Sequence, residues 1–312
     1  MKPAPFEYLA VNSVSEAVTA LQRYGPNSRI IAGGQSLMQE MNLRQTRPAF
    51  LVDINGIKEL DYIRETANGL AIGALTRHRT VERSELVQKI CPLLQEAVKH
   101  IAHFQIRNRG TIGGSLSHNA PGAEYGVVTR LLDAEIVAVG PDGERIIPAE
   151  KFFIGHFKTD LKPAEMVTEV RFPALSKETG YAFLEVTRRH GHIPIVSTAA
   201  TLRLNPDDTV KEAHIALGNV SSKGVPYKVK AVSRLYGQKL TQDVLADLAK
   251  AIEAEVDPDP HADSEAVFVK QFSGITSRRV SELSSATYRK QVSSALSCRA
   301  LNIAFQRIKG GI

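Results

Sequence analysis

The chain has 312 residues, 43% of them hydrophobic, which favours two or three compact units with apolar cores. Its net charge of +6 comes from scattered lysines and arginines, without an arginine-rich arm, a zinc-finger signature or an RNA-recognition signature, so we expect no nucleic-acid binding. Anionic cofactor phosphates or an acidic partner explain the charge better. No apolar run is long enough to span a membrane and the first residues lack a secretion signal, so we expect a cytoplasmic protein.

Cysteine usage limits the metal chemistry that this chain can carry. Cys91 and Cys298 are the only cysteines, and two thiols cannot supply the four ligands of an iron–sulfur cluster. Any cluster must therefore belong to another polypeptide. His100 and His103 have a spacing that could hold a metal, but no third ligand is evident, so we predict two polar residues on a helix face and no metal site.

The first unit is predicted to be α/β. Ser15–Tyr24 has the apolar spacing of a short amphipathic helix, with Ser13 or Ser15 as its cap. Two short apolar runs, Arg29–Ala32 and Phe50–Ile54, are predicted to be buried strands.

The middle and last units mix strands and helices. In the middle unit we predict strands at Leu70–Ala74, Ala134–Val139 and Met166–Phe172, a hairpin turn at Pro141–Gly143, and one long helix over Val81–His103 that bends near Pro92. In the last unit we predict strands at Tyr181–Arg189, Val196–Leu204 and Glu212–Gly218, and helices at Thr241–Ala254 and Ala286–Phe305. Boundaries near 55 and 176 divide the chain into units 1–55, 56–175 and 176–312.

The first candidate site is the motif Ala32-Gly33-Gly34-Gln35-Ser36, directly after a predicted strand. Paired glycines let the backbone take a positive φ and approach a ligand closely, and consecutive N–H groups can then converge on a phosphate oxygen. Ser36 would add a hydroxyl donor. An ordinary tight turn explains this motif equally well when it is taken alone.

The second candidate site is Arg107-Asn108-Arg109-Gly110-Thr111-Ile112-Gly113-Gly114-Ser115, again a glycine pair framed by hydroxyls. Two such loops suggest a diphosphate bound from two sides. Neither motif is a P-loop or the G-x-G-x-x-G fingerprint. Asp53 lies about 20 residues beyond Gly33, as a Rossmann fold would require. The glycines are adjacent and no long helix obviously follows them, so we expect Asp53 to tie the strand end instead.

At these motifs the chain closely resembles the FAD-binding medium subunits of molybdenum hydroxylases of the carbon monoxide dehydrogenase and xanthine dehydrogenase type. The likeness is strongest in Ile31–Leu37, Met41–Arg44, His100–His103 and Ile106–His118. It continues over most of the chain, through Phe152-Phe153, Arg188-Arg189 and Tyr288-Arg289.

The resemblance implies an α+β fold: a two-domain, non-Rossmann FAD-binding fold of the PCMH or vanillyl-alcohol-oxidase type, followed by a C-terminal α+β domain with a three-stranded antiparallel sheet and helices. It also implies which residues bind FAD. These are Ile31, Ala32, Gly33, Gly34, Gln35, Ser36 and Leu37; Ile106, Gly110, Thr111, Gly113, Gly114, Ser115, Ser117 and His118; and Glu124, Leu161, His192 and Ile193 nearer the flavin.

Several positions depart from the family pattern. Ala120 replaces a common aspartate, Gln39-Glu40 replaces an apolar and proline-containing pair, and Gly191–Pro194 replaces a Gly-Asp-aromatic-Ala stretch near the flavin ring. Residues 265–284 look like an insertion. These changes leave the expected pyrophosphate contacts intact and alter the surroundings of the flavin ring.

The function implied by the resemblance is electron relay. FAD would take electrons from two [2Fe–2S] clusters of a small subunit and pass them to an external acceptor, while a large subunit with the molybdenum cofactor hydroxylates an N-heterocycle or another aromatic substrate. Such subunits form heterotrimers that dimerise. We assign no catalytic residue, and expect Tyr8, His118, His192 and Tyr227 to be structural or solvated. The alternatives are a stand-alone flavin oxidase and an interaction subunit that has lost its cofactor.

Overall fold

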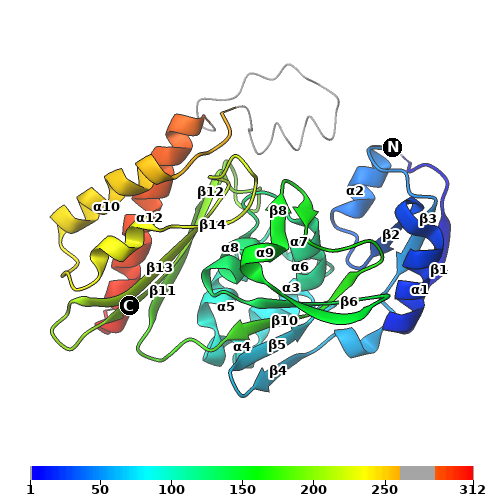
Figure 1. The fold of residues 1–312 in the computed structure, drawn as a ribbon, viewed down its shortest axis with the longest axis horizontal. Coiled ribbons are helices and arrows are strands. Elements are labelled where there is room, and N and C mark those ends of the chain that lie inside the picture. Colours follow the sequence, from blue (N-terminus) through cyan, green and yellow to red (C-terminus); the bar gives the residue numbers. More distant parts are fainter. Residues whose placement is uncertain (1, 261–284, 312) are drawn as a thin grey trace.

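The computed structural model describes residues 2–260 and 285–311, and the expected insertion at 265–284 lies outside the described residues. Three units follow one another from right to left in Figure 1. They are a small N-terminal unit, a middle unit with a five-stranded sheet and several short helices, and a C-terminal sheet covered by two long helices. The boundaries expected near 55 and 176 stay predictions, because the apolar cores are shared. Leu75 and Met166, for example, pack in the cluster of the N-terminal unit.

The N-terminal unit is a parallel sheet with the strand order β1-β3-β2. Its elements are β1 (Glu7–Ala10), α1 (Val14–Tyr24), η1 (Gly25–Asn27), β2 (Ser28–Ile31), α2 (Leu37–Asn42) and β3 (Phe50–Asp53). The predicted helix and both strands are confirmed. Ser13 is the helix cap, since its side chain accepts a hydrogen bond from the Glu16 N–H. Because the strands are parallel, the first glycine motif and the end of β3 leave the sheet at the same edge.

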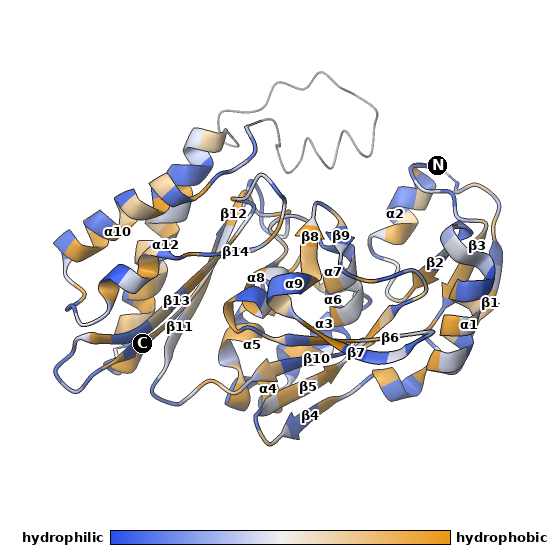
Figure 2. Ribbon diagram, in the orientation of Figure 1, coloured by the Kyte–Doolittle hydropathy of each residue, from blue (hydrophilic) through white to orange (hydrophobic). Residues whose placement is uncertain are grey.

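The middle unit is built on an antiparallel sheet with the strand order β4-β5-β10-β6-β7. These strands are β4 (Ile63–Thr66), β5 (Gly69–Gly73), β6 (Glu135–Gly140), β7 (Gly143–Pro148) and β10 (Met166–Pro173). Shorter elements around it are η2 (Lys58–Leu60), α9 (Ala149–Phe152), β8 (Phe153–Gly155) and β9 (Lys158–Thr159). Figure 2 shows the polar edge strand β4 beside apolar β5, which is buried along its whole length.

The long helix predicted over Val81–His103 is wrong. The structure has three short helices there, α3 (His78–Arg83), α4 (Glu85–Ile90) and α5 (Pro92–Val98). Ser84 leaves the helical conformation and caps α4, with its hydroxyl accepting the Val87 N–H. Pro92 starts α5, where its missing N–H costs nothing. His100 and His103 consequently lie beyond the last of these helices and do not share a helix face.

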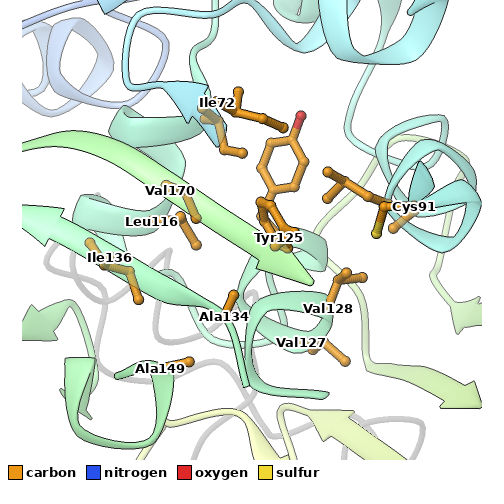
Figure 3. Packing of buried hydrophobic residues seen from close by; sticks show 14 of the residues in the cluster. Ile72, Cys91, Leu116, Tyr125, Val127, Val128, Ala134, Ile136, Ala149 and Val170 are labelled. Atoms are coloured by element: carbon orange, nitrogen blue, oxygen red, sulfur yellow. The ribbon is translucent and has the colours of Figure 1, made fainter. Parts of the chain in front are cut away.

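The core of the middle unit surrounds α8 (Glu124–Leu131), which is buried at seven of its eight positions. Tyr125 is fully buried, and Figure 3 shows its ring among Ile72, Cys91 and Val170. Helix α8 also packs against β12 and β13 of the C-terminal domain. The start of this helix, at Glu124, is thereby fixed between the two units.

The C-terminal domain has a sheet of four strands in the order β11-β12-β13-β14, so the expected three-stranded sheet is wrong by one short strand. Its elements are β11 (Gly180–Val186), β12 (Val196–Leu204), β13 (Val210–Gly218), β14 (Tyr227–Lys228), η3 (Ala231–Leu235), α10 (Gln242–Glu255) and α12 (Ala286–Ile308). Helices α10 and α12 cover one face (Figure 1). On the other face, Phe183, Ala199 and Ala216 join the core of the middle unit.

Candidate functional site

The two glycine motifs, 76 residues apart from Gly33 to Arg109, are in direct contact. A Cβ added at Gly33 would stand 2.3 Å from the Arg109 carbonyl oxygen and 2.8 Å from the Gly110 Cα. These neighbours are backbone atoms that no side-chain rotation can move away. Gly33 therefore allows the end of β2 to lie against the start of the second motif.

A chain of polar contacts joins the same two motifs. Asn55, just beyond β3, donates from Nδ2 to the Ala32 carbonyl oxygen at 2.8 Å. Arg77 donates to Asn55 Oδ1 and to the Arg109 carbonyl oxygen, both at 2.6 Å. Asp53 accepts the backbone N–H of Asn55 at 2.8 Å and also the Tyr8 hydroxyl, so the expectation that it ties the strand end is confirmed.

Asn55 and Arg77 were missed by the sequence analysis. The signal for Asn55 was its place directly after a predicted strand, at the edge where the first motif leaves the sheet. Arg77 carried no comparable signal, because its partners are brought to it only by the antiparallel bridge between Arg77 and Thr111. Together with Arg109, which is exposed, Arg77 puts two positive charges beside the junction of the motifs.

The first motif supplies backbone donors. Within the part of the chain that the structure describes, the N–H groups from Gly33 to Leu37 have no hydrogen-bond acceptor. Gly34 has a φ of +70°, in the left-handed region that favours glycine. All residues from Ile31 to Leu37, including Gln35 and Ser36, are half-buried. Unpaired N–H groups facing solvent at a strand end are suited to binding an anion.

The sequence predicted that the second motif would be a loop, and this prediction is wrong. Gly113 and Gly114 lie in the first turn of α7 (Ile112–His118), which follows the short helix α6 (Phe104–Arg107). Thr111 caps α7, and its hydroxyl accepts the Gly114 N–H at 3.1 Å. The N–H groups of Ile112 and Gly113 are bonded to the Thr76 and Ala74 carbonyl oxygens. This motif therefore cannot offer the converging N–H groups that its glycines suggested.

The three glycines of the second motif differ in what a larger side chain would meet at each position. A Cβ at Gly110 would meet the His78 ring at 2.5 Å, and a Cβ at Gly113 would meet Ala74 at 2.6 Å, so internal packing explains both. Gly114 is exposed, and its added Cβ would meet only the Thr111 hydroxyl, at 2.9 Å. Gly114 and the half-buried Ser115 are therefore the members of this motif that a ligand can reach.

The far ends of α2 and α7 are joined by a contact between Glu40 and His118, whose Oε1 and Nδ1 atoms are 3.8 Å apart. Burial lowers the pKa of His118 to about 4, and burial also raises the pKa of Glu40. His118 is therefore neutral at pH 7, and the contact is not an ion pair there. Ser117 and Ile106 are also half-buried next to these helices.

Glu124 occupies the first position of α8 and is only 7% exposed. Burial, and secondarily the nearby charge of Glu185, raise its pKa to about 8. Glu185 lies at the end of β11, with Oε1 3.5 Å from His100 Nδ1. The acidic position expected near the flavin is thus part of a group that spans the middle and C-terminal units.

The residues expected around the flavin ring lie in two places. His192 and Ile193, between β11 and β12, are half-buried, and the adjacent Gly191 packs on His103, to whose ring an added Cβ would come within 2.6 Å. This segment therefore lies against the chain that leads into the second motif. Leu161 is half-buried after β9 and packs on the core of the middle unit.

Other titratable groups serve the fold. The Tyr227 hydroxyl donates to Glu255 at 2.8 Å in the C-terminal domain. Across residues 2–260 and 285–311, no group of three or more His, Cys, Asp or Glu side chains could hold a metal ion. None of the described helices is long and apolar enough to cross a membrane.

Replacing Glu124 by glutamine should change the pH dependence of stability. Because the folded-state pKa is raised from 4.5 to about 8, the folded chain keeps a proton that the unfolded chain releases, so the wild type loses stability as pH rises between these values. Glu124→Gln lacks this loss and should be more stable than the wild type by about 1–3 kcal/mol at pH 8, with little difference at pH 4. Urea unfolding of the FAD-free chain measures both values.

Glu165→Gln is the control for this measurement. Its hydrogen bond with Arg145 lowers the pKa of Glu165, so this carboxylate is ionised in both states between pH 5 and 8 and the slope there should not change. Identical slopes for the wild type and Glu124→Gln would mean that Glu124 is already ionised in the folded chain.

Comparison with known proteins gives the family. The model of the FAD binding domain in molybdopterin dehydrogenase matches residues 4–175, and that of the CO dehydrogenase flavoprotein C-terminal domain matches residues 181–271. The 6-hydroxypseudooxynicotine dehydrogenase complex subunit alpha of Paenarthrobacter nicotinovorans is 40% identical over 260 residues, covering 83% of this chain and 88% of the relative. The carbon monoxide dehydrogenase medium chain of Hydrogenophaga pseudoflava is 39% identical over 258 residues, covering 83% and 89%.

Solved structures agree with these relatives. A chain of carbon monoxide dehydrogenase from Hydrogenophaga pseudoflava, in a form lacking the Mo-pyranopterin moiety, superposes with a TM-score of 0.87 at 35% identity over 98% of this chain and 99% of that chain. A chain of quinoline 2-oxidoreductase from Pseudomonas putida 86 superposes with a TM-score of 0.86 at 29% identity over 100% and 99%. The chain belongs to the family of FAD-binding medium subunits of molybdenum hydroxylases, the oxidoreductase complexes that include carbon monoxide dehydrogenase.

Proposed function

We propose that this chain binds the pyrophosphate of FAD at the junction of its two glycine motifs and relays electrons from iron–sulfur clusters of a partner subunit to an external acceptor. The observation that carries the proposal is the contact of Gly33 with Arg109 and Gly110. This contact brings the first motif, with its unpaired N–H groups, next to the second motif, in which Gly114 is exposed and Ser115 is half-buried.

The charges at the junction fit a dianionic pyrophosphate. Arg77 and Arg109 are the nearby cations, and the N-termini of α2 and α7 add partial positive charge. Thr111 is committed to capping α7, so Ser36 and Ser115 are the hydroxyls left to donate to phosphate oxygens. Bound FAD would supply the redox chemistry at its isoalloxazine ring, while the protein holds and orients it. Glu124, Leu161, His192 and Ile193 are proposed to lie near that ring, and Ile106 to contact FAD beside the second motif.

The thiols of this chain leave cluster chemistry to a partner. Cys91 is fully buried, and burial raises the pKa of its thiol to about 12. Cys298 donates its thiol to the Leu245 carbonyl oxygen on the far side of the C-terminal sheet. We therefore propose two [2Fe–2S] clusters on a small subunit and the molybdenum cofactor on a large one, in a dimer of heterotrimers located in the cytoplasm.

The substrate of the complex is proposed to be an N-heterocycle or a related aromatic compound. Relatives named as a caffeine dehydrogenase subunit and a nicotine 6-hydroxylase subunit support this class, at 34% and 33% identity. The stand-alone flavin oxidase and the cofactor-free interaction subunit are less well supported. The unpaired N–H groups of the first motif would have no role in a chain that binds no cofactor. The same holds for the contact of Gly33 with the second motif.

Gly114→Val tests FAD binding. The added side chain would occupy the open surface where a phosphate is proposed to lie, while disturbing only the Thr111 cap, at a cost of about 0.5–2 kcal/mol in stability. Loss of one charged hydrogen bond of about 2–3 kcal/mol should weaken FAD binding roughly 30- to 150-fold, so the variant should fold but purify nearly colourless. Flavin absorbance per protein measures this.

Gly155→Val is the matched control, because its added Cβ meets nothing closer than 3.8 Å and it lies outside both motifs. It should keep its flavin. Gly33→Val is unsuitable, since it collides with backbone whether or not FAD is bound. A Gly114→Val chain fully loaded with FAD would contradict the proposed site.

The division of labour between subunits is tested with the chain alone. It should carry FAD but should not oxidise a heteroaromatic substrate, because the molybdenum centre and the clusters are proposed to lie on other chains. Dye reduction driven by the substrate is measured for the isolated chain and for the complete complex as positive control. Turnover by the isolated chain would overturn this division.

Ile193→Tyr tests the segment between β11 and β12 as the element that controls access of the acceptor. An aromatic ring there could shield the flavin face, and Pro194 stiffens the backbone that presents it. The variant should keep FAD and change, by several-fold, the relative reoxidation rates with oxygen, a quinone or dye, and NAD. Ile154→Tyr, on exposed β8, is the control. Unchanged rates with loss of FAD would make the segment a binding element.

A further inference from the structure

Three titratable side chains meet where the middle unit touches the C-terminal sheet. Glu124 comes from the start of α8, Glu185 from the end of β11 and His100 from the turn after α5. His100 Nδ1 is 3.5 Å from Glu185 Oε1, and Glu185 is near enough to Glu124 for its charge to raise the pKa of that carboxyl. His100 and Glu185 are therefore in contact, and Glu124 lies within reach of the Glu185 charge.

The two carboxyls are far more buried than the histidine. The side chain of His100 is 33% exposed and that of Glu185 is 5% exposed, while Glu124 is 7% exposed as a residue. Glu185 Oε2 is buried and has no hydrogen-bond partner among the described residues. A buried carboxylate oxygen without a donor is costly, so its presence calls for a role. A neighbouring carboxyl that holds a proton would satisfy it.

Two ion pairs nearby are formed among other residues. Glu96 of α5 is paired with Arg307 at 2.8 Å, and Arg107 is paired with Glu82 at 3.0 Å. Phe183 of β11 packs on the His100 ring, at 5.3 Å between centroids. Towards solvent, the rings of His103 and His190 are 6.1 Å apart and Arg188 and Arg189 are exposed. The three groups thus lead from a basic, solvated rim to an apolar interior.

We propose that His100, Glu185 and Glu124 form a proton-transfer path between solvent and the flavin. The proposal rests on the proposed function, in which Glu124 lies near the flavin. Reduction of FAD to FADH2 consumes two electrons and two protons. Electrons from iron–sulfur clusters bring no protons, so water must supply them. Each proton given up by Glu124 is replaced through Glu185 and His100, and the direction reverses when the flavin is reoxidised.

The protonation states suit this transfer. With a pKa of about 8, Glu124 holds a proton at pH 7 and can release it without a large energetic cost. The side chain of His100 is 33% exposed, so it is in contact with water. Neither carboxyl is oxidised or reduced, and the path returns to its starting state after each cycle.

Ferricyanide gives a direct test, because it accepts electrons and takes up no protons. Photochemically reduced, FAD-loaded chain is mixed with ferricyanide, so that each FADH2 yields FAD, two ferrocyanides and two protons. Flavin absorbance reports electron loss, and a pH indicator reports proton release. We expect proton release to slow by about tenfold or more in His100→Gln and Glu185→Gln. Glu124→Gln should behave in the same way, with rates expressed per bound FAD.

His214→Gln is the matched control, since His214 is 32% exposed beside a glutamate at 2.9 Å in the C-terminal domain and lies outside the proposed path. It should release protons at the wild-type rate. Wild-type rates in both His100→Gln and Glu185→Gln would overturn the path. A chain that binds no FAD would instead overturn the proposed function, and flavin content is measured first to separate these failures.

A second measurement does not depend on FAD. In the FAD-free chain, the infrared carbonyl band of a protonated carboxyl should be present at pH 6, be lost near pH 8 to 9, and be absent from Glu124→Gln at both. Such a band in the wild type supports Glu124 as the proton-holding member. Its absence at pH 6 would overturn that assignment, and the path with it.

Discussion

The close approach of Gly33 to the backbone of Arg109 and Gly110 is the constraint on which the site depends. It lets the parallel sheet of the N-terminal unit lie against the helix α7 of the middle unit. Arg77 and Asn55 then hold the two backbones together with bonds of 2.6–2.8 Å. Because both contacts use main-chain atoms, the separation of the two motifs is set by the fold and not by flexible side chains.

The two sides of this junction contribute differently. The N–H groups of the first motif are unpaired, whereas the N–H groups in the first turn of α7 are hydrogen-bonded to Thr111, Thr76 and Ala74. These hydrogen bonds fix α7 to the segment that follows β5. Gly114 and Ser115 of α7 are therefore presented in one orientation. A preorganised, positively charged surface of this kind binds an anion without first having to be ordered. The rigid element and the donor-rich element are therefore complementary parts of one site.

Local patterns predicted most of the strands, because alternation and short apolar runs report burial directly. They failed where one residue changes the chain direction: Ser84 and Pro92 divide an apolar stretch that otherwise has helical spacing. Glycine and hydroxyl residues suggested a loop at Thr111–Ser115, although a threonine cap followed by an apolar residue also permits a helix. Arg77 could not be predicted, since its partners come from two distant segments.

The C-terminal domain is part of the site and not an appendage to it. Its sheet brings Glu185 near enough to Glu124 for its charge to raise the pKa of that carboxyl. Its Gly191 packs on His103, which precedes the second glycine motif. The proposed pyrophosphate contacts come from the first two units, whereas the surroundings proposed for the flavin ring come largely from the third. The departures from the family pattern at His192, Ile193 and Pro194 fall in this third contribution. We propose that sequence change there alters which acceptor reaches the flavin, while the junction proposed to hold the cofactor stays intact.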